Sequence, residues 1–149
     1  MRRKEVKKRN NKKEEYNYEY LFLLFAIIVF IDRILKTFLR EGCFYKFCIK
    51  KAINTGAAFG IFPGMTWFFI AIAIVILISI ILFINEFGKT ARIALVFIAA
   101  GTTANLIDRI FFGYVIDILS VFGSSSFNLA DVSNCIGAII LIYSLIRKK

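Results

Sequence analysis

The carboxylates are the main candidates for acid–base chemistry in this chain, because the sequence contains no histidine. The lack of histidine excludes Ser-His-Asp and Cys-His catalysis and any metal site built on histidine. Two aspartates brought together in a poorly hydrated site share one proton, since both cannot ionise easily. One then accepts a proton from water while the other donates to a carbonyl oxygen. Asp117 and Asp131 are the candidates for such a pair, which can cleave a peptide bond without a metal or cofactor.

Further polar side chains interrupt two of the apolar stretches. Asp32 and Lys36 are four residues apart, which places them on one helix face in the orientation that favours an ion pair. Asn105 precedes Asp108 by three residues and Arg109 by four, so these three also share a face. Ionisable groups in a membrane segment cost free energy and usually face a bundle interior with a function. We therefore expect these five residues to surround the reactive carboxylates.

The two candidate aspartates come from different elements. Asp117 falls in the run GYVIDIL (113–119), whose composition is typical of a short strand. Asp131 lies at the N-terminal end of the last apolar stretch, where the helix dipole favours an ionised carboxylate and Asn128 can cap free N–H groups. A serine-rich segment between them allows the chain to fold back.

The composition indicates an integral membrane protein formed by a single domain, residues 1–149. Hydrophobic residues make up 59% of the chain, and the mean hydropathy is +0.73. Four apolar segments are visible and, where short, can be extended: 21–39, 67–84, 92–112 and 127–146. Each is then long enough for a helix that spans a bilayer. The predicted fold is all-α, with four transmembrane helices and a small extracytoplasmic β-sheet or loop region.

The charge pattern predicts the orientation in the membrane. The chain carries 20 basic and 10 acidic residues, and the basic ones concentrate in the tail 1–15 and at the C-terminal end. Basic tails beside apolar runs are typical of cytoplasmic termini. The loops 40–66 and 113–126 then face outward, and the polar cluster lies near the outer face. The same positions argue against nucleic-acid binding and favour contact with membrane lipids.

The three cysteines do not form a metal-binding pattern. Cys43 and Cys48 can pair if their loop faces an oxidising space, but their spacing does not decide this. Cys135 is expected to be a small core residue.

Several alternative interpretations accompany these hypotheses. Asp108 with Arg109, and Asp32 with Lys36, can be structural ion pairs, and Asn128 can be a simple helix cap. Asn54 and Gly56 can merely shape a turn. For the whole protein, the alternatives are a proton-coupled transporter that uses the carboxylates as a relay, and a structural membrane subunit. A relay needs ionisable groups across both leaflets, and the cytoplasmic halves of the apolar segments lack them.

Together, four blocks of sequence resemble the lipoprotein signal peptidases, also called signal peptidase II. The blocks are NTGAAFG (54–60), the run from 101 through ANLIDR to GYVID (101–117), FNLAD (127–131) and the first-segment pair Asp32 and Lys36. The resemblance covers roughly residues 20–146. It implies a bacterial cytoplasmic-membrane aspartic endopeptidase that removes the signal peptide of a diacylglyceryl-modified prolipoprotein just before the modified cysteine. We expect it to act as a monomer.

The resemblance also implies residue roles. Asp117 and Asp131 match the catalytic aspartates, and the supporting or substrate-binding positions match Asn54, Gly56, Asn105, Asp108, Arg109, Asn128, Asp32 and Lys36. Two positions depart from the pattern, Ala104 where glycine is common and Ile118 where an aromatic residue often follows the aspartate.

Overall fold

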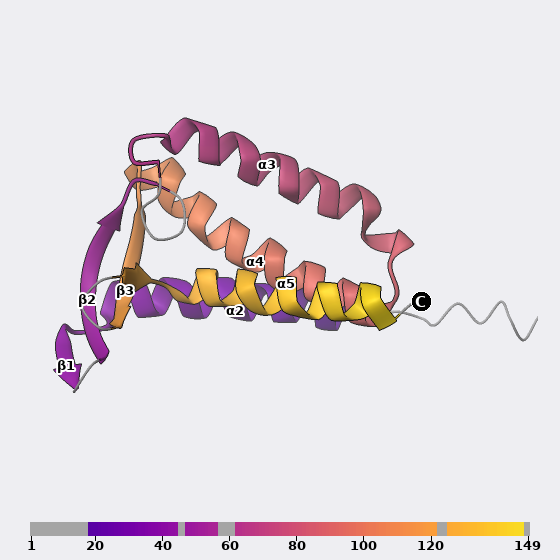
Figure 1. Ribbon diagram of the computed structural model, residues 1–149, viewed down its shortest axis with the longest axis horizontal. Helices are drawn as coiled ribbons and strands as arrows, with labels where there is room; N and C mark the ends of the chain where they lie inside the picture. The colour runs from indigo at the N-terminus through magenta and orange to yellow at the C-terminus, as the bar shows by residue number, and fades with distance from the viewer. Residues whose placement is uncertain (1–17, 45–46, 57–61, 122–124, 148–149) are drawn as a thin grey trace, which may run out of the picture.

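The structure, a computed structural model, describes residues 18–44, 47–56, 62–121 and 125–147. It is mostly helical, with a small antiparallel sheet at one end of the helices (Figure 1). The elements in chain order are α2 (Tyr18–Phe38), β1 (Gly42–Phe44), β2 (Phe47–Asn54), α3 (Thr66–Phe83), the short 3-10 helix η2 (Ile84–Glu86), α4 (Lys89–Phe112), β3 (Val115–Val121), β4 (Ser125–Phe127) and α5 (Leu129–Arg147). The basic tail 1–15 and residues 57–60 of the NTGAAFG block lie outside the described residues.

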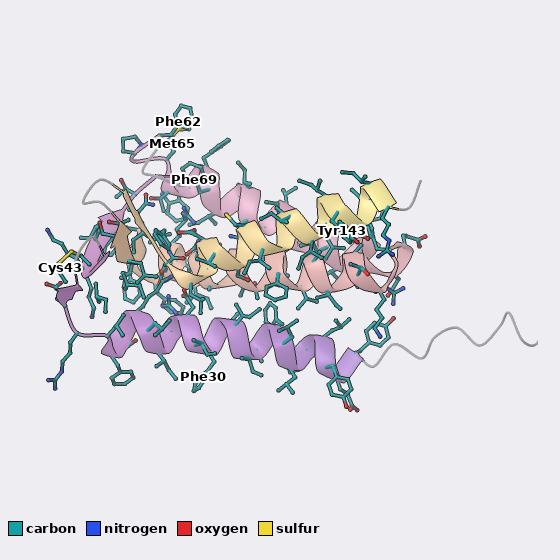
Figure 2. The ribbon with its side chains drawn as sticks, turned by 60° about the horizontal axis from the view of Figure 1, so that its bottom comes forward. Phe30, Cys43, Phe62, Met65, Phe69 and Tyr143 are labelled. Carbon is teal, nitrogen blue, oxygen red and sulfur yellow. A yellow bond between two sulfur atoms is a disulfide. The ribbon has the colours of Figure 1, made fainter. Side chains whose placement is uncertain are left out.

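By length and composition, three helical segments among the described residues can cross a membrane: Thr66–Glu86, Lys89–Phe112 and Leu129–Arg147. They confirm three of the four predicted spans. Helix α2 is 21 residues long, about 31 Å at 1.5 Å per residue, but it is not among these segments because Asp32, Arg33 and Lys36 place three charges close together within it. Those charges point inward, since Asp32 is fully buried while Phe30 is 66% exposed and points away from the other helices (Figure 2).

Helices α4 and α5 pack closely because small residues line their contact. The buried residues of α5 are Ala130, Ser133 and Gly137. A Cβ atom at Gly137 would lie 2.7 Å from the carbonyl oxygen of Ala94 on α4, and Ser133 donates to the Phe97 carbonyl at 2.8 Å. Small residues and interhelical hydrogen bonds are the usual means of association in a membrane, where hydrophobic burial does not distinguish partner from lipid.

The sheet has the order β1-β2-β3-β4 with antiparallel neighbours. It lies where α2 and α4 end and α3 and α5 begin (Figure 1). The predicted strand containing Asp117 is confirmed as β3, and Asp117 pairs with Ala52 of β2 after a register shift. The sheet therefore delivers Asp117 to the ends of the helices.

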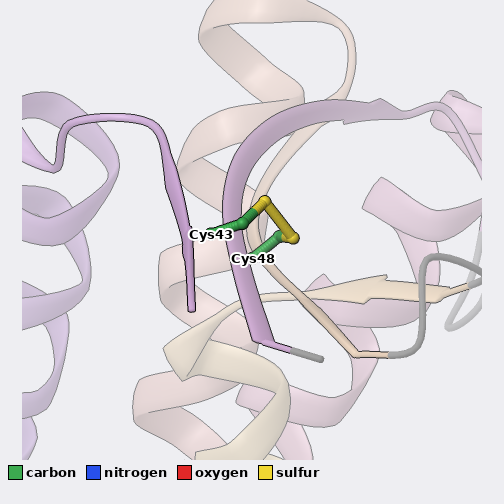
Figure 3. Close-up of a disulfide and its surroundings, with 2 residues drawn as sticks. All are labelled: Cys43 and Cys48. Carbon is green, nitrogen blue, oxygen red and sulfur yellow. A yellow bond between two sulfur atoms is a disulfide. The ribbon is translucent and has the colours of Figure 1, made fainter. Parts of the chain in front are cut away.

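The open question about the cysteines is resolved by a disulfide between Cys43 and Cys48 (Figure 3). The two residues face each other across the β1–β2 hairpin, with Cα atoms 4.1 Å apart. The expectation for Cys135 was wrong, because this free thiol is exposed on α5. It occupies the side of the helix opposite the small residues that contact α4.

Candidate active site

Asp117 is held at the end of the sheet by two asparagines. Its side chain is buried, with 2% of the residue surface exposed. Asn54 Nδ2 donates to Oδ2 at 3.1 Å, and Asn128 Nδ2 donates to Oδ1 at 2.8 Å. Asn54 in turn accepts the Gly56 backbone N–H at 3.0 Å, so it both shapes the turn after β2 and fixes the carboxylate.

Asp131 is held in the first turn of α5 by a reciprocal cap. Its backbone N–H donates to Asn128 Oδ1 at 2.9 Å, while the Asn128 N–H donates to Asp131 Oδ2 at 3.2 Å. Asn105 Nδ2 donates to Asp131 Oδ1 at 2.9 Å. Asn128 is therefore a helix cap, as one alternative supposed, and it also contacts Asp117.

Two buried or nearly buried amides join the carboxylates into one network. Asn128 Nδ2 donates to Asn105 Oδ1 at 3.1 Å as well as to Asp117. Burial raises the pKa of Asp117 to about 6, and the nearby Asp131 raises it further against the opposing hydrogen bonds from Asn54 and Asn128. A carboxyl group with this pKa can carry or release a proton near neutral pH.

A buried ionic cluster lies beneath this network, formed by Asp32, Arg33 and Lys36 of α2 and Asp108 of α4. Lys36 Nζ lies 2.8 Å from Asp32 Oδ2 and 2.7 Å from Asp108 Oδ2. Arg33 lies 2.5 Å from Asp108 and 3.3 Å from Asp32. Two cations thus balance two anions. Sequence reasoning missed Arg33, although a charge inside the apolar run was the available signal.

The ionic cluster also holds the backbone beside each candidate aspartate. Asp108 Oδ2 accepts the N–H of Ile116 at 3.2 Å, next to Asp117. Asp32 Oδ1 accepts the N–H of Ala130 at 3.0 Å, next to Asp131. These bonds connect helices α2 and α4 directly to the two chain segments that carry the candidate aspartates.

Arg109 has a different environment from Asp108, so the suggested structural pair of these neighbours is wrong. Among the described residues, no ion pair joins them. Consecutive helix residues point in different directions. Arg109 donates to the Gly56 carbonyl at 2.8 Å and stacks over the Phe69 ring at 5.2 Å.

A cavity of about 270 Å³ opens between α3, α4 and α5 beside Asp131. One wall is apolar and comes from α3, whose Phe69 lies at the sheet end of the helix (Figure 2). Residues of α4 and α5 line the rest, and the whole lining comprises Phe69, Ile72, Ala73, Ile76, Thr102, Asn105, Arg109, Asp131, Asn134 and Cys135. A groove with an apolar wall that leads to the partly buried Asp131 carboxylate can admit a hydrophobic peptide.

Eight of the ten predicted site residues belong to this network or to the ionic cluster beneath it. The other two, Gly56 and Arg109, lie at its edge, where Arg109 donates to the Gly56 carbonyl. No cluster of three or more histidine, cysteine or acidic side chains able to hold a metal ion occurs in the part of the chain described. The arrangement joins two carboxylates in one hydrogen-bond network, and the raised pKa of Asp117 lets that group take up or release a proton near pH 6.

The chain is similar in sequence to a family model and to several known proteins. Residues 24–147 match the family model described as signal peptidase (SPase) II. The lipoprotein signal peptidase of Clostridium novyi is 34% identical over 147 residues, covering 87% of this chain and 98% of that protein. The lipoprotein signal peptidase of Syntrophomonas wolfei is 33% identical, covering 79% of this chain and 87% of that protein.

The fold is also similar to that of solved structures. A bacterial membrane enzyme determined by the in meso method at 2.3 Å resolution superposes with a TM-score of 0.80 at 28% identity, covering 89% of this chain and 90% of that one. A second such structure, at 1.9 Å resolution, gives a TM-score of 0.78 over 90% of this chain and 97% of that one.

Proposed function

This chain belongs to the signal peptidase II family, and from that premise we propose that it is an aspartic endopeptidase that cleaves lipid-modified prolipoproteins just before the diacylglyceryl cysteine. The observation that carries the proposal is the shared hydrogen-bond network of Asp117 and Asp131, in which Asn128 contacts both. The two carboxylates come from different elements, strand β3 and helix α5, and Asp131 also lines the groove.

In the proposed mechanism, Asp117 and Asp131 share one proton and hold a water molecule between them. The ionised member takes a proton from the water as it attacks the scissile carbonyl, and the protonated member donates to the carbonyl oxygen. The C–N bond then breaks as the leaving amine takes the proton that came from the water, while the hydroxyl returns its proton to the other aspartate, so the pair again shares one proton. The acid and base roles belong to the pair as a coupled system. The raised pKa of Asp117, about 6, supports proton sharing within the pair.

The proposed location is the bacterial cytoplasmic membrane, with α2 as a fourth span, both termini in the cytoplasm and the site near the outer face. The basic tail supports this orientation. The Cys43–Cys48 disulfide supports it independently, because disulfides persist in oxidising compartments and this one lies at the sheet end. A monomeric enzyme would then receive its signal helix laterally, through the groove between α3 and α5.

The test is a gel-shift assay in detergent micelles. Wild type is mixed with a diacylglyceryl-modified prolipoprotein, or with the same protein lacking the lipid, beside the variants Asp131→Asn and Glu86→Gln. Glu86 is an exposed acid in η2, at the other end of the helices from the sheet. We expect wild type and Glu86→Gln to cleave the lipidated form alone, and Asp131→Asn to cleave neither. If folded wild type cleaves neither form, the peptidase function is rejected, and a proton-coupled transporter or a structural membrane subunit is favoured instead.

A further inference from the structure

The groove contains a second polar pair that the catalytic network does not use. Thr102 of α4 donates its hydroxyl to Asn134 Oδ1 of α5 at 3.4 Å, and both residues line the cavity. Thr102 lies three residues before Asn105, and Asn134 three residues after Asp131. Because α4 runs toward the sheet and α5 away from it, the pair lies one helical turn further from the sheet than the Asn105–Asp131 bond.

The fold makes room for the Asn134 side chain. A Cβ atom at Gly101 would lie 2.6 Å from Asn134 Oδ1 and would also collide with the Ala130 carbonyl. Glycine at position 101 therefore lets the asparagine amide sit against α4, where Thr102 fixes its oxygen. The Thr102 bond orients the opposite side of the amide, its NH₂ group, for other contacts.

That NH₂ group has no hydrogen-bond partner among the described residues. An amide donor left unused in a membrane groove that faces an apolar wall is costly, and polar groups in such places usually serve a pathway or a ligand. The facing wall from α3 offers only apolar side chains, including Ile72 and Ile76. The missing acceptor must therefore come from whatever enters the groove.

A signal peptide supplies that acceptor for a physical reason. A protease acts on an extended peptide, so the transmembrane signal helix must unwind beside the cut. Unwinding exposes carbonyl groups that the surrounding hydrocarbon cannot satisfy. The polar pair lies about 4.5 Å along the helices from the level of Asp131, and an extended chain advances about 3.3 Å per residue. It would meet the peptide one or two residues upstream of the scissile bond.

We infer that Asn134, oriented by Thr102, is a substrate-binding residue that donates a hydrogen bond to a backbone carbonyl of the unwound signal peptide, one or two residues upstream of the cut. This inference rests on the proposed peptidase function. In this inference, the Thr102–Asn134 pair holds the peptide in an extended conformation, while Asp117 and Asp131 act on the scissile bond.

The experiment measures kcat/KM for synthetic lipidated peptides with Asn134→Leu, which keeps a similar size and removes the amide. The expected loss is roughly 10- to 100-fold, the effect of leaving a buried acceptor unsatisfied. Thr102→Val should reduce kcat/KM less, because it only allows the Asn134 side-chain amide to rotate. The matched control is Thr103→Val, one residue along α4 and outside the groove lining. Its kcat/KM should equal that of wild type.

A substrate change then separates binding from a structural effect. Each of the two amide bonds upstream of the cut is replaced by an ester, which weakens its carbonyl as an acceptor. We expect one ester to slow wild type clearly and to slow Asn134→Leu little further, so that the two effects are not additive.

Three outcomes would overturn the inference. If each ester lowers kcat/KM of Asn134→Leu as much as that of wild type, Asn134 is a structural residue. If Asn134→Leu and wild type have equal rates, Asn134 does not bind the substrate. If Asn134→Leu fails to fold, equal rates for Thr102→Val and Thr103→Val would reject the inference. In each of these cases wild type still cleaves, and the proposed function stands. Failure of wild type to cleave any lipidated peptide rejects that function, and the inference with it.

Discussion

The side-chain amide of Asn128, which lies just before α5, donates to Asp117 of β3 at 2.8 Å. The same side chain caps α5 by accepting the N–H of Asp131 at 2.9 Å. Asn128 therefore holds Asp117 of β3 and Asp131 of α5 in a fixed position relative to each other.

Replacement of Asn128 by alanine is expected to reduce turnover by at least about 10²-fold, because a 1 Å displacement of a reacting group has this effect. It should also lower the free energy of unfolding by about 1 kcal/mol through loss of the helix cap. Cleavage rates and melting temperatures in micelles measure the two effects. A variant with lower stability but normal turnover would show that Asn128 is only a cap.

Asp117→Asn and Asp131→Asn are each expected to abolish turnover, by about 10³-fold or more, because the single remaining carboxyl group cannot act as both acid and base. Both variants should still insert and fold, since asparagine keeps the size of the side chain. Cleavage assays and size-exclusion profiles in detergent check this, with Glu86→Gln as the matched control. Retained cleavage by either aspartate variant contradicts the assignment of the pair.

The raised pKa of Asp117 predicts how stability depends on pH. The group titrates near 3.8 when unfolded and near 6 in the folded protein. Between these values the folded state binds more protons, so its stability falls as pH rises from about 4 to 6. The full loss is on the order of 2 to 3 kcal/mol, and it persists above pH 6.

Melting temperatures of wild type and Asp117→Asn, measured from pH 4 to 7.5, test this dependence. As pH rises, the melting temperature of wild type should fall relative to that of Asp117→Asn, and the difference should become constant above about pH 6. A difference that stays constant across this range would show that Asp117 titrates normally.

The ionic cluster predicts a large stability effect for Lys36→Met. Lys36 is 2% exposed and lies between Asp32 and Asp108, so its loss leaves buried carboxylates with insufficient positive charge. Breaking a buried pair in this way typically costs about 3 to 5 kcal/mol. Thermal unfolding in micelles should show it, while Lys89→Met, at an exposed position on α4, should melt like wild type. Equal melting of both variants would mean that the cluster contributes little.

The proposed orientation predicts where thiols are accessible in intact cells. In a Cys135→Ser background, reduction should let a membrane-impermeant maleimide label Cys43 and Cys48 without permeabilisation. A cysteine-free protein carrying Glu86→Cys should be labelled only after permeabilisation, because η2 lies at the opposite end of the helices (Figure 1). The reverse pattern would place the sheet and the site in the cytoplasm.

The sequence by itself predicted most of the helices, the strand with Asp117 and the polar residues that the structure gathers into the candidate site. Apolar length identified the helices at 66–83, 89–112 and 129–147 to within a few residues, because the membrane requires a long run without charge. Polar residues inside such runs identified Asp32, Lys36 and Asn105 as inward-facing, since lipid tolerates them poorly. The run GYVIDIL placed Asp117 on a strand.

Only the tertiary structure decided how these residues are paired. Helical spacing grouped Asp108 with Arg109, yet Asp108 pairs with Lys36 and Arg33 of α2 while Arg109 contacts Gly56 and Phe69. Periodicity fixes the face of one helix but not which helix lies opposite. The Cys43–Cys48 bond likewise required the hairpin register. The exposure of Cys135 followed from the close contact of α4 with the other side of α5, where Gly101 and Gly137 leave no space for larger side chains.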